Sequence, residues 1–431
     1  MANIIEPRIL KGFRDFLPGA EIERRSLVER IEASFRLYGF VPIDTPALEY
    51  AEILLGKGGG ETEKQIYRFI DHGGRDVALR FDLTVPFARF VAEHRETLPL
   101  PFKRYHIAKV WRGENTQRGR YREFTQCDFD IVGSESPAVD FEILLVMRNT
   151  LKAIGAGDVT IRMNHRGLFN RLITRLNLRD KAADILRTVD KLAKAGRDAT
   201  AVSLEELTGG GKAAEILRFI EARGSFEETL DTIAEAAGGE GPESERLRLI
   251  RSFMLDMGIA DSFVLDPSIT RGLDYYTGIV FETFLTAMPE IGSVCSGGRY
   301  DDLAGLYSRE KLTGVGSSLG LDRLIAALES LGKAGGRSTY VKAAIACVDE
   351  AAGGAYQALA DRFRERGIPC EVFPEAKKLT QQFILAEKKG AHWVIVPGEK
   401  PSESPLTLRE LKTRRDRTDL SFEEAAAILS R

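Results

Sequence analysis

Several features are missing or scarce in this chain of 431 residues, and each absence excludes a class of protein. The four cysteines are far apart and form no CxxC pair, so the sequence offers neither a disulfide framework nor a zinc site, and a reducing cytosol is the expected compartment. No run of about 18 apolar residues occurs, which argues against a membrane span. The first residues carry charges instead of the apolar stretch of a signal peptide, so we expect no export.

An excess of one charge is also lacking. The 61 Lys and Arg residues against 64 Asp and Glu residues leave a net charge of −3, so any polyanionic partner must meet a local basic patch. The hydrophobic content of 43% and the charged content of 29% are typical of a folded protein and exclude a disordered one. At roughly 150 residues per domain, the length predicts about three compact units.

No P-loop for nucleotide phosphates is present. Gly211 and Lys212 are followed by Ala213, and Glu206 stands where the first glycine of the motif would be. The glycine cluster at residues 56–60 has no following Lys-Ser or Lys-Thr pair. We interpret both glycine clusters as turns, so nucleotide chemistry in this chain requires another scaffold.

The order of apolar patterns predicts a sheet domain that is split by a helical insertion. Residues 21–37 place apolar side chains at helical spacing, whereas residues 40–133 alternate short apolar runs with charged turns, as strands joined by loops do. Helix-like stretches follow, strand-like sequence returns after Thr270, and residues 314–328 indicate the opening of a helix. From residue 341, strands and helices alternate as they do around a largely parallel sheet. The expected units are a sheet domain at 1–166 and 258–330, an insertion at 167–257, a linker at 331–340 and an α/β domain at 341–431.

The densest group of polar side chains lies in residues 109–133, where two strand-like runs flank a polar loop and predict a hairpin. Its polar side chains are Arg112 and Glu114 on the first strand, Arg118, Arg120 and Arg122 in the loop, and Gln126, Asp128 and Asp130 on the second strand. Arginines that converge beside carboxylates suit a substrate with a phosphate and a cationic group. A solvated hairpin with surface ion pairs is the alternative interpretation.

Three glycine-rich stretches are further candidates. Residues 270–278 place Arg271 between glycines and aromatic residues, and arginine is almost never buried without an anionic partner. The other two stretches add Arg299 and Arg323 beside glycines, whose small size lets a ligand approach the backbone closely. A turn with a stacked arginine is the alternative for the first stretch. We assign no role to any of the five histidines.

Together these motifs resemble the histidyl-tRNA synthetases, a branch of the class II aminoacyl-tRNA synthetases. The likeness begins at KGFRD, residues 11–15, and extends into the C-terminal module. GFVPIDTPALE, the pair VWRGE and REFTQCDFD, and GVGSSLGLDR are similar to the three class II motifs, while RGLDYYTG and GGRYD resemble the two stretches peculiar to the histidyl branch. The resemblance implies an α+β fold, in which an antiparallel-sheet catalytic domain with a helical insertion precedes an α/β anticodon-binding domain.

The resemblance also implies roles for individual residues. Arg112 and Arg271 would be catalytic, with Arg112 on the α-phosphate of ATP and Arg271 in the place that a metal ion takes in other class II enzymes. The residues implied in ATP binding are Arg112, Glu114, Arg120, Phe124 and Arg323, with Phe124 and Arg323 on either side of the adenine. The residues implied in histidine binding are Asp82, Thr84, Arg112, Gln126, Asp130, Arg271, Tyr275, Tyr276 and Tyr300. Carboxylates and tyrosine hydroxyls suit an imidazole because they can hydrogen-bond its ring nitrogens.

The partners that the resemblance implies are L-histidine, ATP with Mg²⁺ and the histidine tRNA, together with an isologous homodimer and a cytoplasmic location. It implies no zinc, haem or flavin, no membrane, and no cluster of side chains for a metal. A local basic run, Arg409, Lys412, Arg414, Arg415 and Arg417, is either a phosphate contact or a solvated face. The alternative function is a regulatory paralogue that binds histidine, of the type that governs ATP phosphoribosyltransferase. Such paralogues typically lack the C-terminal module that this chain has.

Overall fold

The computed structural model of the chain describes residues 5–56, 61–190, 192–270, 276–301, 305, 307, 312–333, 338–401 and 404–430. The chain divides into two compact units, of which the larger contains residues 27–333 and the smaller residues 338–430. The larger unit is built on an eight-stranded sheet. In spatial order its strands are β1 (Val41–Pro42), β5 (Phe102–Trp111), β6 (Glu123–Val132), β11 (Gly314–Gly320), β10 (Cys295–Tyr300), β9 (Ile279–Leu285), β7 (Val159–His165) and β8 (Phe263–Leu265).

Strand pairing in this sheet is mainly antiparallel. The pairs β1–β5 and β7–β8 are parallel and the other neighbouring pairs are antiparallel. The longest pairing is the hairpin of β5 and β6, which faces Phe102 with Val132 and Trp111 with Glu123. The antiparallel sheet expected from the sequence is therefore confirmed.

One face of the sheet covers the main hydrophobic core. Because strand residues alternate between faces, Cys127, Phe129 and Ile131 of β6 all point into this core. The helices α1 (Pro18–Leu37) and α5 (Pro137–Ala153) contribute Phe35 and Met147, among others, to the same core. The opposite face of β6 carries the polar residues and is left for the site.

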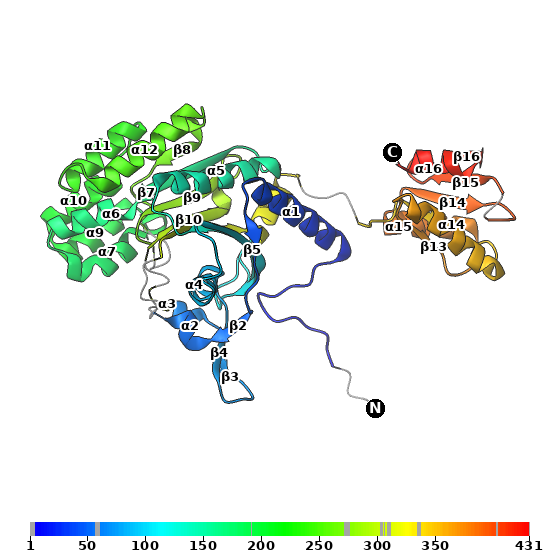
Figure 1. Cartoon of the computed structure of the whole chain (residues 1–431), viewed down its shortest axis with the longest axis horizontal. Helices are drawn as coiled ribbons and strands as arrows, with labels where there is room; N and C mark the ends of the chain where they lie inside the picture. Colours follow the sequence, from blue (N-terminus) through cyan, green and yellow to red (C-terminus); the bar gives the residue numbers. More distant parts are fainter. Residues whose placement is uncertain are drawn as a thin grey trace. The chain divides into compact units, whose positions relative to one another are not determined.

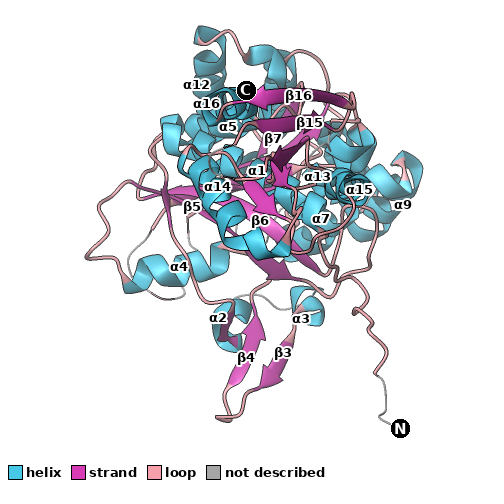
Figure 2. Cartoon of the chain, turned by 90° about the vertical axis from the view of Figure 1, so that its right-hand side faces the viewer, coloured by secondary structure: helices cyan, strands magenta, loops and turns pink. Residues whose placement is uncertain are grey.

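A second, three-stranded sheet lies in the same unit, in the order β2 (Leu48–Tyr50), β4 (Asp76–Leu79) and β3 (Arg68–Ile70). Figure 2 shows β3 and β4 side by side near the short helices α2 (Ala51–Leu55) and α3 (Glu61–Gln65). The sequence predicted strands joined by loops throughout residues 40–133, but β4 ends at Leu79 and the helix α4 (Thr84–Glu93) begins five residues later. The apolar face of α4, including Phe87 and Val91, packs in a second core and this burial favours the helix.

Helices fill the segment between β7 and β8. They are α6 (Arg166–Arg175), α7 (Ala182–Asp190), α8 (Leu192–Ala195), α9 (Arg197–Thr208), α10 (Gly210–Ile220), α11 (Phe226–Ala236) and α12 (Pro242–Asp256). They gather beside β7 and β9 (Figure 1) and share the main core with the sheet. The helix α11 begins with a capping box, in which Ser225 and Glu228 satisfy each other's backbone N–H groups.

Residues 314–328 were predicted to open a helix, and this is only half correct. Residues Gly314–Gly320 form the central strand β11, and the helix α13 (Leu321–Ser330) begins directly after it. The glycines in this segment are therefore strand residues between β6 and β10.

The smaller unit is a five-stranded sheet with helices. Its strands are β13 (Cys370–Val372), β12 (Ala343–Ile345), β14 (Trp393–Pro397), β15 (Leu406–Glu410) and β16 (Arg415–Leu420), in that spatial order. Its helices are α14 (Gly353–Glu365), α15 (Leu379–Lys389) and α16 (Phe422–Ser430). The pairs of β12 are parallel as predicted, but β15 and β16 add an antiparallel hairpin (Figure 2). Among the described helices of the whole chain, none is both long enough and apolar enough to cross a membrane.

Candidate active site

The predicted site residues gather on the face of the large sheet that points away from the main core. Phe124, Gln126, Asp128 and Asp130 alternate along β6 and therefore share this face. The register places Asp130 opposite Arg104 of β5. Tyr300 enters the same face from the end of β10, since its hydroxyl reaches Asp130.

Glycines hollow this face around Asp130. A Cβ atom on Gly316 would lie 1.9 Å from Asp130 Oδ1, and one on Gly314 would lie 2.4 Å from the Tyr300 ring. A Cβ atom on Gly298 of β10 would meet the ring of Tyr276 at 2.8 Å. These glycines make room for the carboxylate and the two tyrosines, which is the usual meaning of glycine inside a strand.

Asp130 is held from two sides. Its Oδ1 accepts a hydrogen bond of 2.6 Å from the Tyr300 hydroxyl, and its Oδ2 lies 2.6 Å from Arg104 Nη2. Burial raises the pKa of Asp130, and the positive charge of Arg104 opposes that shift. Burial also raises the pKa of Tyr300 well above its usual value, so its hydroxyl stays protonated and donates. The geometry suits a carboxylate that receives a ring N–H.

Gln126 and Asp128 lie next to Asp130 on β6. The Gln126 amide donates to the Ser318 hydroxyl at 2.6 Å, and its buried Oε1 has no partner among the described residues. Burial raises the pKa of Asp128 to about 7, although Arg104 acts in the opposite direction. Gln126 thus offers an acceptor to a ligand, and a buried acceptor without a partner is costly unless a ligand supplies the donor.

Asp82 and Thr84 come from the start of α4. Asp82 is almost fully buried, and its Oδ1 accepts a hydrogen bond of 3.1 Å from the backbone N–H of Val85. Thr84 is the first residue of the helix and is half-buried. Asp82 also acts electrostatically on Asp128, because its negative charge contributes to the raised pKa of that carboxyl group. The two elements therefore present acidic groups to one region, which suits a substrate ammonium group.

Arg112 stands at the end of the β5–β6 hairpin. Its Nε donates to the carbonyl of Phe81 at 2.8 Å, and its guanidinium carbon lies 5.2 Å from the centre of the Phe124 ring. Arg112 and Glu114 were predicted on the first strand, but β5 ends at Trp111. The chain turns away there because the N–H of Gly113 bonds to the carbonyl of Gln65 at 2.7 Å instead of continuing the hairpin.

The remaining residues predicted for ATP lie close enough to interact electrostatically. Burial lowers the pKa of the Arg323 guanidinium to about 10, the positive charge of Arg120 lowers it as well, and Glu114 acts in the opposite direction. Gly119, in the hairpin loop, approaches Arg323 so closely that a Cβ atom would lie 3.3 Å from the Arg323 Cα. Arg323 Nη1 donates to the carbonyl of Ser293. An anion between these arginines would relieve their mutual repulsion.

Two of the predicted residues, Arg271 and Tyr275, lie outside the described residues. Tyr276 is described and half-buried, and it acts electrostatically on Tyr300. Arg299 had been noted as a further arginine near the site, but it projects from the other face of β10. There it forms a buried ion pair of 2.6 Å with Asp140 of α5. This follows from the period of a strand, since Arg299 is the neighbour of Tyr300.

Sequence reasoning missed two buried groups on this side of the sheet. Arg104 is completely buried against Asp130, and His106 pairs with Asp44 at 2.9 Å. Burial lowers the pKa of His106 to about 4, with a further lowering by Arg104, so the ring is neutral at physiological pH. The signal was present, because Arg104 and His106 occupy alternate positions in a strand that is otherwise largely apolar.

The N-terminal stretch KGFRD contacts this region too. Arg14 pairs with Asp322 and its guanidinium lies 3.8 Å from the ring of Tyr121 in the hairpin loop. The carbonyl of Gly12 accepts the N–H of Arg122 at 2.9 Å, while Asp322 Oδ2 accepts the backbone N–H of Thr125 at 2.6 Å. The stretch thereby ties the hairpin to the start of α13.

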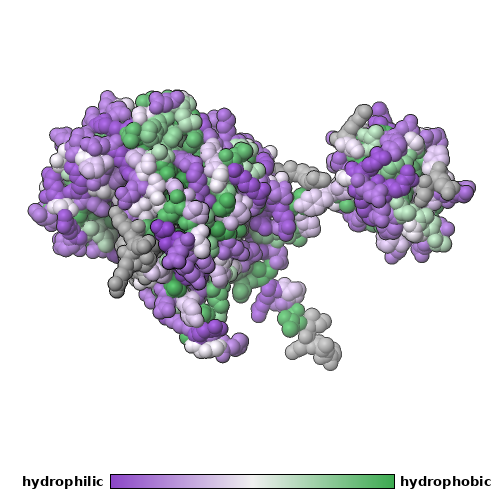
Figure 3. Space-filling view, in the orientation of Figure 1, coloured by the Kyte–Doolittle hydropathy of each residue, from purple (hydrophilic) through white to green (hydrophobic). Residues whose placement is uncertain are grey.

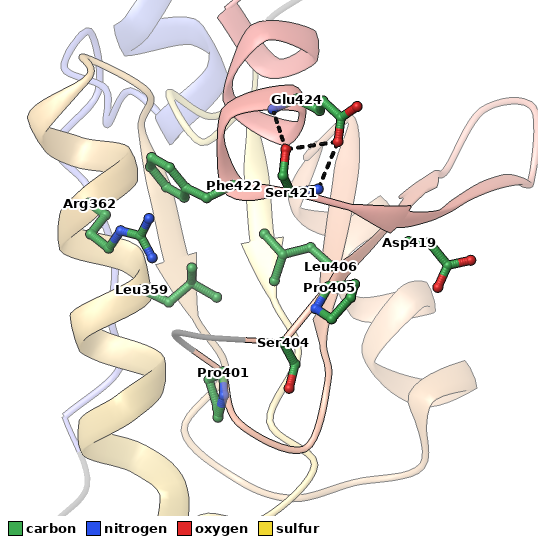
Figure 4. A pocket seen from close by; sticks show the side chains of 10 residues that line it. All are labelled: Leu359, Arg362, Pro401, Ser404, Pro405, Leu406, Asp419, Ser421, Phe422 and Glu424. Carbon is green, nitrogen blue, oxygen red and sulfur yellow. Dashed lines mark hydrogen bonds between the residues drawn. The ribbon is translucent and has the colours of Figure 1, made fainter.

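A cavity of about 410 Å³ lies elsewhere, in the smaller unit. Its lining residues are Leu359, Arg362, Pro401, Ser404, Pro405, Leu406, Asp419, Ser421, Phe422 and Glu424 (Figure 4). The guanidinium of Arg362 lies 3.9 Å from the centre of the Phe422 ring, and Ser421 bonds to Glu424 at the start of α16. None of the residues predicted for ATP or histidine lines this cavity. In the described parts of the chain, no group of three or more His, Cys, Asp or Glu side chains is arranged to hold a metal ion.

Comparisons with known proteins cover nearly the whole chain. A family model described as histidyl-tRNA synthetase matches residues 12–324, and one described as an anticodon binding domain matches residues 342–431. A protein of Treponema denticola named histidine–tRNA ligase is 53% identical over 399 residues, which are 91% of this chain and 89% of the relative. The crystal structure of histidyl-tRNA synthetase from a Nostoc species is similar with a TM-score of 0.85, 30% identity and 99% coverage of both chains.

A second structural likeness concerns the fold alone. A structure from Bacillus halodurans, titled ATP phosphoribosyltransferase regulatory subunit/histidyl-tRNA synthetase, has a TM-score of 0.76 but only 20% identity, and it covers 91% of this chain and 99% of its own.

Proposed function

The chain belongs to the histidyl-tRNA synthetase family, and from this premise we propose the reaction and the residues that carry it. The chain is a histidine–tRNA ligase, an aminoacyl-tRNA synthetase of class II. It activates L-histidine with ATP to histidyl-adenylate and then transfers the histidyl group to the 3′ end of its tRNA. The observation that carries the assignment of residues is the buried Asp130, held by Tyr300 beside the unpartnered oxygen of Gln126.

The histidine site would lie on the hollowed face of the sheet. An imidazole N–H would donate to the Asp130 carboxylate, and the substrate ammonium group would lie near Asp82 and Thr84. Buried polar groups of this kind discriminate strongly against an apolar analogue, because such an analogue leaves them without hydrogen-bond partners. Tyr275, Tyr276 and Tyr300 belong to the same proposal, as residues around the imidazole.

The first step joins the carboxylate of histidine to the α-phosphorus of ATP and releases pyrophosphate. Such a displacement depends on positioning and on charge neutralisation, and it needs no nucleophilic side chain of the protein. Arg112 is held by Phe81 and Phe124 in a fixed position at the hairpin end, where it can neutralise the α-phosphate. We place Arg271 at the same phosphate.

The adenosine and the outer phosphates of ATP would occupy the space between the hairpin loop and α13. Phe124 and Arg323 would contact the adenine, and Arg120 with Glu114 would lie toward the distal phosphates and their Mg²⁺ ion. The repulsion between Arg323 and Arg120 supports an anion at this position. In the second step, the terminal ribose hydroxyl of the tRNA attacks the histidyl carbonyl, and AMP leaves.

The tRNA partner is supported by the anticodon-binding module, proposed here at residues 341–431. In the basic run, Arg409 is paired with Asp416 at 2.8 Å and Arg417 lies 5.6 Å from the Trp393 ring, so neither is the best candidate for a phosphate. Lys412, Arg414 and Arg415 are exposed. Lys412 and Arg414 lie in the turn between β15 and β16, and Arg415 is the first residue of β16. These three are the proposed phosphate contacts. The remaining proposed limits are 1–166 and 258–330 for the catalytic domain, 167–257 for the insertion and 331–340 for the linker.

A homodimer and a cytoplasmic location complete the proposal. The homodimer is supported by a group of exposed apolar side chains near the three-stranded sheet, where Leu48, Tyr50, Phe69 and Ile70 are between 39% and 65% exposed. In Figure 3, apolar side chains lie among hydrophilic ones on this part of the surface. An isologous interface would bury such residues on both subunits. The regulatory alternative is not favoured, because the relatives at 42–53% identity carry the ligase name.

The direct test of this assignment is charging of a histidine tRNA transcript with radiolabelled histidine by the purified full chain and by Asp130→Asn. We expect the wild-type protein to charge the tRNA and the variant to show a large increase in the KM for histidine with little change in the KM for ATP. If Asp130→Asn charged the tRNA as well as the wild-type protein does, this result would contradict the assigned role of Asp130.

A further inference from the structure

Arg104 is the one completely buried arginine on the histidine side of the sheet in the described ranges. Its Nη2 lies 2.6 Å from Asp130 Oδ2 and 3.4 Å from the carbonyl of Leu83. Its guanidinium carbon also lies 4.1 Å from the centre of the Phe87 ring of α4. Nη2 makes both polar contacts and the Phe87 ring packs against the guanidinium, while Nε and Nη1 are buried with no hydrogen-bond partner among the described residues. Arg104 is therefore held beside Asp130 from β6, from the segment before α4 and from α4 itself.

The charges around Asp130 make this arginine important. Arg104 of β5 and Tyr300 of β10 act directly on Asp130. The groups linked to it at one remove are Asp128 of β6, on which Asp130 and Asp82 act, Tyr276, which acts on Tyr300, and His106, on which Arg104 acts. Burial raises the pKa of both Asp128 and Asp130, and so favours the neutral form of these two carboxyl groups. The positive charge of Arg104 lowers the pKa of both Asp128 and Asp130, whereas the hydrogen bonds of Ser318 and Tyr300 lower the pKa of one carboxyl group each.

We propose that Arg104 is a positioning residue for histidine recognition, which keeps Asp130 as an oriented anion whose free lone pairs accept the imidazole N–H. The proposal rests on the proposed function and goes beyond it, because Arg104 is not among the residues assigned to the substrate and acts through the Asp130 carboxylate. With Oδ2 held by Arg104 and Oδ1 held by Tyr300, the carboxylate plane is fixed before histidine arrives. Each oxygen keeps acceptor capacity for a further donor.

The test is the pH dependence of histidine activation in Arg104→Met. Without the guanidinium, the Asp130 carboxyl group holds its proton to higher pH. We expect the acidic limb of kcat/KM for histidine, measured by ATP–pyrophosphate exchange, to move upward by a pH unit or more, while the KM for ATP stays near its wild-type value. On that limb, a shift of one unit lowers kcat/KM about tenfold. The titration of free histidine is the same for every variant, so the difference reports on the enzyme.

Two further variants separate positioning from mere structural support. Arg104→Lys keeps the charge and should restore most of the acidic limb, although it loses the planar fork. If Arg104 acts through Asp130, the double variant Arg104→Met/Asp130→Asn should be no worse in kcat/KM for histidine than Asp130→Asn alone. The double variant also removes both buried charges together, so it keeps the test available if Arg104→Met alone fails to fold.

Arg246→Met is the matched control, because Arg246 also pairs with a buried carboxylate, Asp140, but on the other face of the sheet. It should lose stability without moving the acidic limb. The proposal would be overturned if Arg104→Met left the acidic limb of kcat/KM for histidine unchanged, or if the losses in kcat/KM were additive in the double variant. The proposed function would still stand in that case, as long as the wild-type protein shows histidine-dependent exchange. Absence of exchange by the wild-type protein would instead refute the proposed function.

Discussion

Replacing Gly316 with alanine probes the histidine side of the site without replacing a charged residue. Gly316 lies in the middle of β11, paired with Asp130 of β6 and with Gly298 of β10. Its Cβ atom would lie 1.9 Å from Asp130 Oδ1, 2.4 Å from Asp130 Cγ and 3.0 Å from the Phe129 carbonyl oxygen. All three distances are shorter than an ordinary contact between carbon and its neighbours.

The strand cannot move aside easily, because β11 is hydrogen-bonded to β6 on one side and to β10 on the other. The Asp130 side chain must therefore rotate, and both its contact with Tyr300 and its ion pair with Arg104 are lengthened or broken. Overpacking of this kind costs about 1–3 kcal/mol of stability. The larger effect falls on histidine recognition, since the carboxylate loses its orientation.

The assay compares denaturant unfolding with the KM values for histidine and ATP in pyrophosphate exchange. The matched control is Gly320→Ala, four residues along the same strand, where the closest contact of a Cβ atom is an ordinary 3.8 Å. We expect Gly316→Ala to raise the KM for histidine at least tenfold more than it raises the KM for ATP, since a loss of about 1.4 kcal/mol in binding corresponds to a factor of ten. We expect Gly320→Ala to change the KM for histidine little. A histidine KM like that of the wild type in Gly316→Ala would refute this account of the glycine.

Three further predictions address the ATP site, stability and assembly. Arg112→Lys should lower the rate of steady-state exchange roughly 100-fold, because lysine lacks the planar guanidinium and its hydrogen bond to the Phe81 carbonyl. A rate near that of the wild type would argue against the placement of Arg112 at the α-phosphate. Burial lowers the pKa of His165 in the folded protein to about 3. Between that pH and the usual histidine pKa, the imidazole is therefore protonated in the unfolded chain but neutral in the folded one. The stability that the neutral, buried His165 contributes is complete above the usual histidine pKa and is lost as the pH falls. His165→Asn, which keeps an acceptor for the N–H of Gly167, should flatten the pH dependence of the denaturant midpoint in that range, and an unchanged slope would count against it. Ile70→Glu should shift sedimentation from dimer toward monomer, and an unaltered sedimentation coefficient would exclude Ile70 from the proposed interface.

The sequence predicts much of this site because several of the site residues lie only a few positions apart within the same motif. Asp130 and Gln126 could be predicted on one face from alternation alone, since a strand has a period of two residues. Arg112 could be identified, but its exact place could not, because the chain leaves the strand at a hydrogen bond from Gly113 to Gln65, far away in the sequence. Such contacts do not follow from local patterns.

The missed residues depend on register and on packing. Arg104 is opposite Asp130 only in the observed register of β5 and β6, and a shift of one residue would point it to the other face. Residues 314–328 were predicted to open a helix, whereas Gly316 lies in the strand β11, where the Asp130 carboxylate occupies the space that a side chain would take. Arg299 was noted near the site for the same reason, because sequence alone does not say which face of β10 it joins.

The most direct measurement is ATP–pyrophosphate exchange by the purified full chain, with each of the twenty amino acids tested separately. The account predicts exchange with histidine and none with the other amino acids, since Asp130, Tyr300 and Gln126 are arranged for hydrogen bonds to an imidazole. Exchange with a different amino acid, or no exchange with any amino acid by folded protein, would contradict the central claim.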